Sequence, residues 1–271
     1  FILEPFLPTK AVTLFDALGE SGKSLFALQM CMCLASGRQF LGLPVVDKKR
    51  ILYIVGEETD YDFNERMEKI QKALQVSDDD LKNIAWISIL SKDFQCSTYS
   101  LLDEAGKGIE KTEFYEYLKT IISQWKPDLV VLDSLGNFYA LDENSTRHGL
   151  KFMESLKMLI RDYGCSFLLI HHQNKEAMKK DGEKIFRGTI TFREQARCRF
   201  YIEKVSDDVK RVVIEKLNKP TIFSREYYVR LATSTENLEP CLSFILTDPP
   251  PTKEVRVRKN GSKKEEIEEF F

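Results

Sequence analysis

Short apolar runs alternate with amphipathic stretches along the first two thirds of the chain. The runs are rich in β-branched residues, which is typical of buried strands. The predicted strands are 12–15, 51–55, 84–89, 129–132 and 166–171. Between them, apolar residues recur every three or four positions, which predicts helices. The predicted helices are 23–35, 112–125 and 146–163, with a further one between the first two whose apolar positions are Phe63, Met67, Ile70 and Leu74. Strands that alternate with helices predict an α/β fold with a mainly parallel sheet and helices on both faces.

Two local signals refine this picture. Thr59 or Asp60 can cap the second helix, and Ser77 with Asp80 forms a capping box for a short helix before residues 84–89. Residues 91–110 have no periodicity, so we expect an irregular surface loop there.

The last third of the chain has a different pattern. Strand-like runs follow one another at 188–192, 197–205, 209–217, 227–231 and 241–246. Residues 206–208 have the composition of a hairpin turn. We therefore expect antiparallel strands that extend the same sheet, so that residues 1–247 form one domain. Residues 248–271 are Pro-rich and then basic, which indicates a linker that could begin a truncated C-terminal domain.

Length and composition are those of a globular protein with a full core. The 271 residues are 43% hydrophobic and 30% charged. No apolar run approaches the roughly 18 residues of a membrane span, and no leader pattern opens the chain. The six cysteines follow no metal spacing, so we expect a cytoplasmic protein with reduced thiols. Because the chain opens on Phe1 and closes on Phe271 within an acidic stretch, we expect it to be an excerpt.

A phosphate loop follows the first predicted strand. Residues 17–24 read ALGESGKS and match G-x4-GK[ST], with Ala17 in place of the first glycine. In such a loop, Lys reaches the terminal phosphates of ATP and a hydroxyl binds Mg²⁺. We therefore predict these roles for Lys23 and Ser24, at the start of a helix. The residues expected to surround the phosphates are Gly19, Glu20, Ser21, Gly22, Lys23, Ser24 and Leu25.

The alternative for this segment is an ordinary helix-capping turn. If the position of Ala17 requires a positive φ, alanine costs about 1 kcal/mol or more there. The strand before the loop and the amphipathic helix after it favour the nucleotide site.

Polar residues end three of the predicted strands. Glu57 and Glu58 follow the second strand, Asp133 the fourth, and His171 and His172 the fifth. Ligands of open α/β sheets bind at the carboxyl ends of the strands, so these side chains should meet the phosphate loop. Asp133 suits the Mg²⁺ shell, through water. Glu57 is placed to orient or deprotonate the attacking water.

Each of these residues also has a simpler explanation. Asp133 could be a helix cap, and Glu57 and Glu58 could belong to a solvated turn. Strand alternation puts His171 and His172 on opposite faces, so at most one of them faces the nucleotide.

Together these motifs resemble the RecA-fold ATPases, and within them the branch of the hexameric plasmid replicative helicase RepA. The resemblance spans roughly residues 5–235. It rests on ALGESGKSLFALQM, ILYIVGEET with Arg66-Met67 after it, PDLVVLDSLGNFYALDENST, FLLIHHQNK and FRGTI. It implies a RecA-like ATPase domain over 1–247 that assembles as a homo-hexamer or another ring, with ATP and Mg²⁺ bound between subunits.

The resemblance also implies roles for single residues. Glu57 resembles the catalytic carboxylate, Asp133 the Walker-B acid and His172 the γ-phosphate sensor. Arg66 resembles an arginine lining the nucleotide pocket, and Arg187 resembles the arginine finger supplied to a neighbour's site. Further arginines follow closely: Arg193, Arg197 and Arg199. The alternative for this cluster is a strand edge with solvated guanidiniums.

Two loops are candidates for contact with single-stranded DNA, 135–149 and 174–186. In RecA-like rings the equivalent loops line the central channel. The second loop has a mild basic excess suited to a DNA backbone. Its lysines are Lys175, Lys179, Lys180 and Lys184. Phe138 and Tyr139 in the first loop could stack on bases or be buried in the interface between subunits.

These observations predict an ATP-hydrolysing, ring-forming motor, foremost a helicase that translocates on single-stranded DNA in the replication of a plasmid, phage or mobile element. The formal net charge of −2 argues against a protein that coats DNA by bulk charge. The alternative is a RecA-like or KaiC-like regulatory or recombination-mediator ATPase without unwinding activity. A third reading is a structural nucleotide-binding subunit with little turnover.

Overall fold

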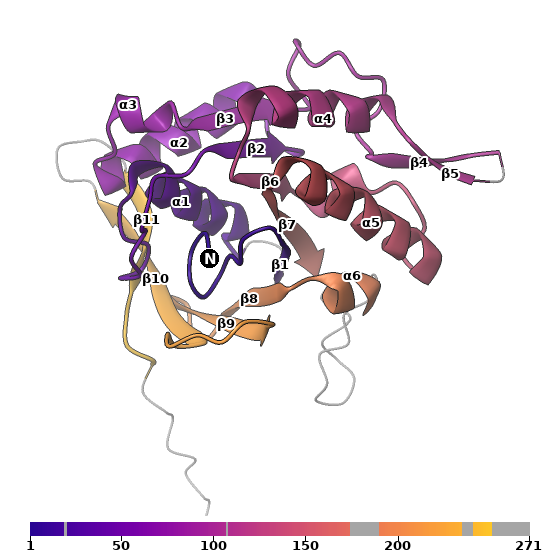
Figure 1. Cartoon of the computed structure of the whole chain (residues 1–271). Helices are drawn as coiled ribbons and strands as arrows, with labels where there is room; N and C mark the ends of the chain where they lie inside the picture. Colours follow the sequence, from indigo (N-terminus) through magenta and orange to yellow (C-terminus); the bar gives the residue numbers. More distant parts are fainter. Residues whose placement is uncertain (19–20, 107, 174–189, 235–240, 251–271) are drawn as a thin grey trace, which may run out of the picture.

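A single large sheet organises the chain. The computed structural model describes residues 1–18, 21–106, 108–173, 190–234 and 241–250 (Figure 1). The strands of this sheet are β1 (Val12–Leu18), β2 (Ile51–Val55), β3 (Ile84–Ser88), β6 (Leu129–Asp133), β7 (Ser166–Gln173), β8 (Cys198–Lys204), β9 (Val209–Leu217), β10 (Glu226–Ser234) and β11 (Cys241–Leu246). Among the described residues their order is β11-β10-β9-β8-β1-β7-β6-β2-β3.

The sheet is parallel on one side and antiparallel on the other. All neighbours from β3 to β8 run parallel, and β8, β9, β10 and β11 pair in antiparallel fashion. This topology confirms the predicted fold class. One detail differs from the expectation, because β8 is parallel to β1 and only the later strands are antiparallel.

Helices cover both faces of the sheet. They are α1 (Lys23–Ser36), α2 (Asp60–Leu74), α3 (Asp78–Leu81), α4 (Glu113–Trp125), α5 (Thr146–Tyr163) and α6 (Ile190–Gln195), with a 3-10 helix, η1, at Leu135–Phe138. Strand residues alternate between two apolar clusters. Tyr53 and Val55 pack with α1 and α2, whereas Leu52 and Ile54 pack with α4 and α5. Burial on both faces explains why the strands are continuously apolar.

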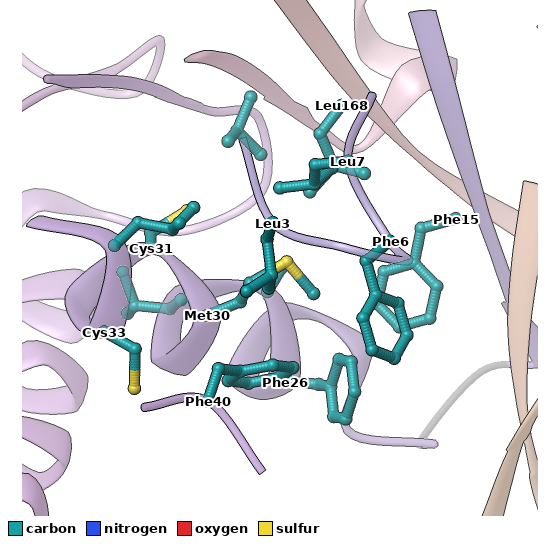
Figure 2. Packing of buried hydrophobic residues seen from close by; sticks show 14 of the residues in the cluster. Leu3, Phe6, Leu7, Phe15, Phe26, Met30, Cys31, Cys33, Phe40 and Leu168 are labelled. Carbon is teal, nitrogen blue, oxygen red and sulfur yellow. The ribbon is translucent and has the colours of Figure 1, made fainter. Parts of the chain in front are cut away.

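The first residues of the chain complete the core beside α1. Phe6 lies 6.2 Å from Phe26 and 5.9 Å from Phe40 between ring centroids, and Figure 2 shows these rings together. Leu3, Phe6 and Leu7 are almost fully buried. Burial of such side chains contributes about 1.5–3 kcal/mol each. The segment therefore anchors α1, and with it the phosphate loop.

Hydroxyl caps set the starts of four of the described helices, and Ser145 caps α5 by accepting from the His148 N–H. The Thr59, Ser77 and Thr112 side chains accept hydrogen bonds from backbone N–H groups at the starts of α2, α3 and α4. Of the two residues proposed for α2, Thr59 is therefore the cap. In the described part of the chain, no helix has the length and apolarity needed to cross a membrane.

Two sequence expectations about secondary structure were wrong. The range 91–110, expected to be irregular, contains β4 (Leu102–Ala105), which pairs with β5 (Gly108–Lys111) in a projecting hairpin (Figure 1). Most of its side chains are exposed, so it lacks an apolar alternation.

The strand expected over 188–192 is also wrong. From Ile190 onward the chain is helical, while residues 188–189 lie outside the described residues. Phe192 packs 5.2 Å from Tyr139 and 5.6 Å from Phe152, between ring centroids. Packing of α6 against α5 therefore outweighs the β-branched composition of this segment.

Candidate active site

The start of α1 has the features expected of an anion-binding site. Gly22 is the N-cap, with a φ of 81° and no side-chain cap. The first N–H groups of a helix lack partners within the helix, and they attract phosphate. The Ser21 hydroxyl is buried with no hydrogen-bond partner among the described residues. A Cβ at Gly22 would lie 2.9 Å from Cζ of Phe244, so only glycine fits here.

Ala17 does not strain the phosphate loop. It continues β1, where it pairs with His172 of β7 and Ile202 of β8. It is not among the residues with positive φ. The penalty considered for alanine therefore does not arise. Gly19 and Glu20 of the loop lie outside the described residues.

A chain of contacts joins Lys23, His172 and Glu57. The Lys23 ammonium lies 2.8 Å from Nδ1 of His172, and Nε2 of the same ring lies 3.2 Å from Oε1 of Glu57. Burial lowers the pKa of Lys23, against the negative charges of Asp133 and Glu57. Burial and the charge of Lys23 lower the pKa of His172. The structure therefore brings together three predicted residues from the ends of separate elements.

Glu57 is held in an ionised form. The Ser134 hydroxyl donates to its Oε1 at 2.6 Å, and the Asn137 amide donates at 3.3 Å. Burial works to raise its pKa, but the bonds from Ser134 and Asn137 and the charges of His172 and Lys23 bring the pKa below its ordinary value. Gly56 permits this approach, because a Cβ there would lie 2.7 Å from the Asn137 amide nitrogen.

Asp133 sits at the buried end of β6. The Tyr53 hydroxyl donates to its Oδ2 at 2.7 Å, and Ser24 also hydrogen-bonds to it. Burial raises the pKa of Asp133, although these two bonds and the charge of Lys23 oppose the rise. Among the described residues, no group of three or more His, Cys, Asp or Glu side chains is arranged to hold a metal ion. A Mg²⁺ ion that keeps water and phosphate ligands would need only Ser24 and Asp133 from the protein, so these residues fit it.

Glu58 and Arg66 pair with each other. Their ion pair spans 2.6 Å, with partly exposed side chains. Burial raises the pKa of Glu58, against the charge of Arg66. Glu57 rather than Glu58 thus faces Lys23. The charge of Arg66 also acts on nearby Tyr53, but its contact with a nucleotide stays a prediction.

A buried ionic network lies beside this site. His171 contacts Asp16 at 2.9 Å, and Arg199 contacts the other oxygen of Asp16 at 2.5 Å. The side chains of Asp16 and Arg199 are only 2% and 1% exposed. Arg199 also pairs with Glu215. The expectation of a strand edge with solvated guanidiniums is therefore wrong for Arg199. The opposite orientations of His171 and His172 are confirmed.

The predicted DNA contacts have different outcomes. Phe138 and Tyr139 are buried, Phe138 against Phe114 and Tyr139 against Phe152. Both rings therefore pack inside the subunit, so the structure supports neither stacking on bases nor burial in a subunit interface. The other predicted contacts, and the predicted arginine finger, lie outside the described residues. They are Lys175, Lys179, Lys180, Lys184 and Arg187.

Lys210 is a site residue without a sequence signal. It donates from β9 to the Ser21 carbonyl at 2.6 Å, and its ammonium lies 5.7 Å from the ring centroid of Phe244. Burial, followed by the charge of Lys204, lowers its pKa. Lys210 and Ser21 are 189 positions apart, so no local motif could reveal the contact. Ser134 and Asn137, by contrast, directly follow the Asp133 motif.

Comparisons with known proteins agree with this geometry. The chain is similar over 90% of its length to 92% of the flagellar accessory protein FlaH from Methanocaldococcus jannaschii, with a TM-score of 0.55 and 13% identity. This likeness supports the RecA-like fold. The family model described as an AAA domain matches residues 2–178. With the phosphate loop and the acidic strand ends, this match makes the chain a nucleotide-binding P-loop ATPase domain. The chain belongs to the AAA domain family.

Proposed function

We propose that this chain is the subunit of a ring-forming ATPase motor that translocates on single-stranded DNA. The observation that carries the catalytic part is the convergence of Lys23, Glu57, Asp133 and His172 beside the N-terminus of α1. Positioning and charge stabilisation account for most catalysis of phosphoryl transfer, and this site offers both.

Each residue has a role that its contacts support. Lys23 exchanges its bond to His172 for the terminal phosphates of ATP. Glu57 is ionised and accepts a proton from the attacking water, or orients it. Ser24 and Asp133 hold Mg²⁺, which neutralises phosphate charge when bound. His172 then connects the phosphate end of the site to Glu57.

The ring is the second part of the proposal. Arg187 would act as an arginine finger in the site of a neighbouring subunit, and such a residue contributes about 10³–10⁵ to the rate. The test mixes Arg187→Ala subunits with Glu57→Ala subunits, each inactive alone. A shared site predicts restored hydrolysis in the mixture, because one interface then combines an intact Glu57 with an intact Arg187. If hydrolysis is not restored in the mixture, Arg187 is not the arginine finger.

DNA translocation is tested by the effect of single-stranded DNA on ATP turnover. A helicase is expected to hydrolyse ATP faster with DNA and to separate a forked duplex when ATP is present. The protein used in the fork assay should include any sequence that flanks this chain in nature. An assembled ring without stimulation would contradict the DNA motor while leaving the ATPase intact.

A regulatory ATPase without unwinding activity is the second candidate. The similar structure is a flagellar accessory protein, and the net charge of −2 is that of a protein not dedicated to bulk DNA binding. A native-mass measurement separates the candidates. Assembly that depends on ATP and Mg²⁺ but is indifferent to DNA would favour the regulatory role.

A further inference from the structure

A basic cleft lies at the edge of the sheet opposite the ATP site. The ATP site occupies the carboxyl ends of the parallel strands, whereas this cleft lies where β1, β7 and β8 begin. It has a volume of about 340 Å³, at the small end of the usual range for ligand sites. Its cationic lining residues are Lys10, Lys157, Arg161 and Arg197. Both sites could therefore be occupied at once.

The positive charge of the cleft is only partly compensated. No carboxylate is among its described lining residues. Arg161 pairs with Asp162 at 2.7 Å. Lys157 instead donates to the amide oxygen of Gln195 at 2.5 Å, and that amide carries no charge. In a chain of net charge −2, this local excess of cations creates a field that attracts anions.

The backbone presents these cations from fixed positions. The Arg197 N–H donates to the Val12 carbonyl at 2.9 Å, which ties the start of β8 to β1. Lys10 has a φ of 51°, a left-handed conformation that is uncommon for residues other than glycine. Its side chain passes near Gly164, where a Cβ would lie 3.8 Å from Cε of Lys10. Unfavourable backbone conformations of this kind cluster at functional sites.

A second cleft of about 200 Å³ adjoins the first. The two clefts share Lys10 and Arg197, and the second adds Lys219. Cations spread over two clefts exceed what one phosphate group can contact. They suit successive phosphates of an extended strand, since single-stranded nucleic acid is held by basic grooves that follow its backbone.

We propose that this basic cleft binds the phosphodiester backbone of single-stranded nucleic acid. The inference rests on the DNA part of the proposed function. It adds a DNA-binding surface made of described residues, which is separate from the predicted DNA loop 174–186. Exposed Lys10, Lys157 and Lys219 supply charge without reading bases. Binding here leaves the ATP site free.

The test measures binding of a fluorescent oligothymidylate to the full chain over a series of salt concentrations. The variant Lys10→Ala/Lys157→Ala should weaken binding about tenfold at low salt and reduce the slope of log affinity against log salt by about 1.4, which corresponds to two lost phosphate contacts. The matched control is Lys48→Ala/Lys82→Ala, which removes two cations that pair with Asp80 and Asp79 elsewhere. The control should bind as the wild type does. Both variants should keep ATP turnover without DNA.

Three results would overturn the proposal. The wild type could hydrolyse ATP yet bind no oligonucleotide, the cleft variant could bind normally, or the control could lose as much affinity. A fourth contrary result comes from competition with millimolar pyrophosphate. If pyrophosphate displaces the oligonucleotide from the control but not from a cleft variant that still binds it, the cleft binds small anions. That result would contradict the binding of a nucleic-acid strand in the cleft. If Lys10→Ala/Lys157→Ala fails to fold, Lys157→Ala/Lys219→Ala replaces it. If the wild-type protein shows no ATP turnover, the proposed function is refuted instead.

Discussion

The Lys23 ammonium lies 2.8 Å from Nδ1 of His172, and this contact defines the protonation of the ring. An ammonium group only donates, so Nδ1 accepts and Nε2 carries the proton toward Glu57. A neutral imidazole thus links the phosphate loop to the carboxylate that faces the attacking water. The lowered pKa of His172 agrees with a neutral ring.

We expect His172 to make the protein less stable in mild acid. Its pKa is below the ordinary 6.5 in the folded chain, because of burial and the charge of Lys23, so the unfolded chain takes up the proton first. Its stabilising effect is present above pH 6.5 and is lost as the pH falls through the folded pKa. Denaturant unfolding at pH 7.5 and 5.5 tests this. His172→Gln should show the smaller loss, and an equal loss would contradict the assignment.

Glu57→Gln should reduce the ATP turnover number about 10²–10⁴-fold, the range for losing a general base. ATP affinity should change little, because the amide keeps the shape of the side chain. Glu58→Gln is the matched control, since Glu58 pairs with Arg66. Its turnover should fall only a few-fold. Steady-state hydrolysis and nucleotide binding measure both effects, and a larger loss in Glu58→Gln would reverse the assignment.

Tyr53→Phe should destabilise the fold by about 1–3 kcal/mol, because it removes a buried donor from the Asp133 carboxylate. The pKa of Asp133 should then rise further, and a higher Mg²⁺ concentration should be needed for turnover. Tyr115→Phe offers a control, since its hydroxyl makes only a 3.5 Å contact with the Ser155 carbonyl. Equal unfolding free energies for the two variants would count against the Tyr53 bond.

Gly22→Ala should abolish ATP binding, whereas Gly37→Ala should spare it. These glycines flank α1 with φ values of 81° and 75°, so each substitution incurs backbone strain of about 1 kcal/mol or more. Only Gly22 adjoins the phosphate site and Phe244. Comparing nucleotide affinity with thermal stability separates the two effects. Retained ATP binding in a folded Gly22→Ala protein would refute the phosphate cradle.

The parallel half of the fold could be predicted because its strands are buried on both faces. Apolar runs such as Ile51–Val55 fix strand positions, and the polar residue after each strand then falls at the ATP site. Periodicity also separated His171 from His172 correctly. The hairpin of β4 and β5 could not be found this way, since its strands expose most side chains.

Contacts between distant parts of the chain lay beyond the sequence patterns. Tyr53 looks like any core residue of β2, yet it donates to Asp133, 80 positions away. Lys210 reaches the phosphate loop from β9, a strand of the same sheet whose β11 is hydrogen-bonded to α1 through Phe244 and Gln29. Arg199 is buried because Asp16 lies on the neighbouring strand β1. Strand order determines such pairs, and composition does not reveal it.

The turnover of Lys23→Ala tests the central claim most directly. Lys23 contacts His172 at the start of α1, and its pKa responds to Asp133 and Glu57. Steady-state ATP hydrolysis should be measured for the wild type, for Lys23→Ala and for Lys82→Ala, an exposed control. We predict that hydrolysis is abolished in Lys23→Ala and unchanged in Lys82→Ala. Wild-type turnover in a folded Lys23→Ala protein would contradict the assignment of this site.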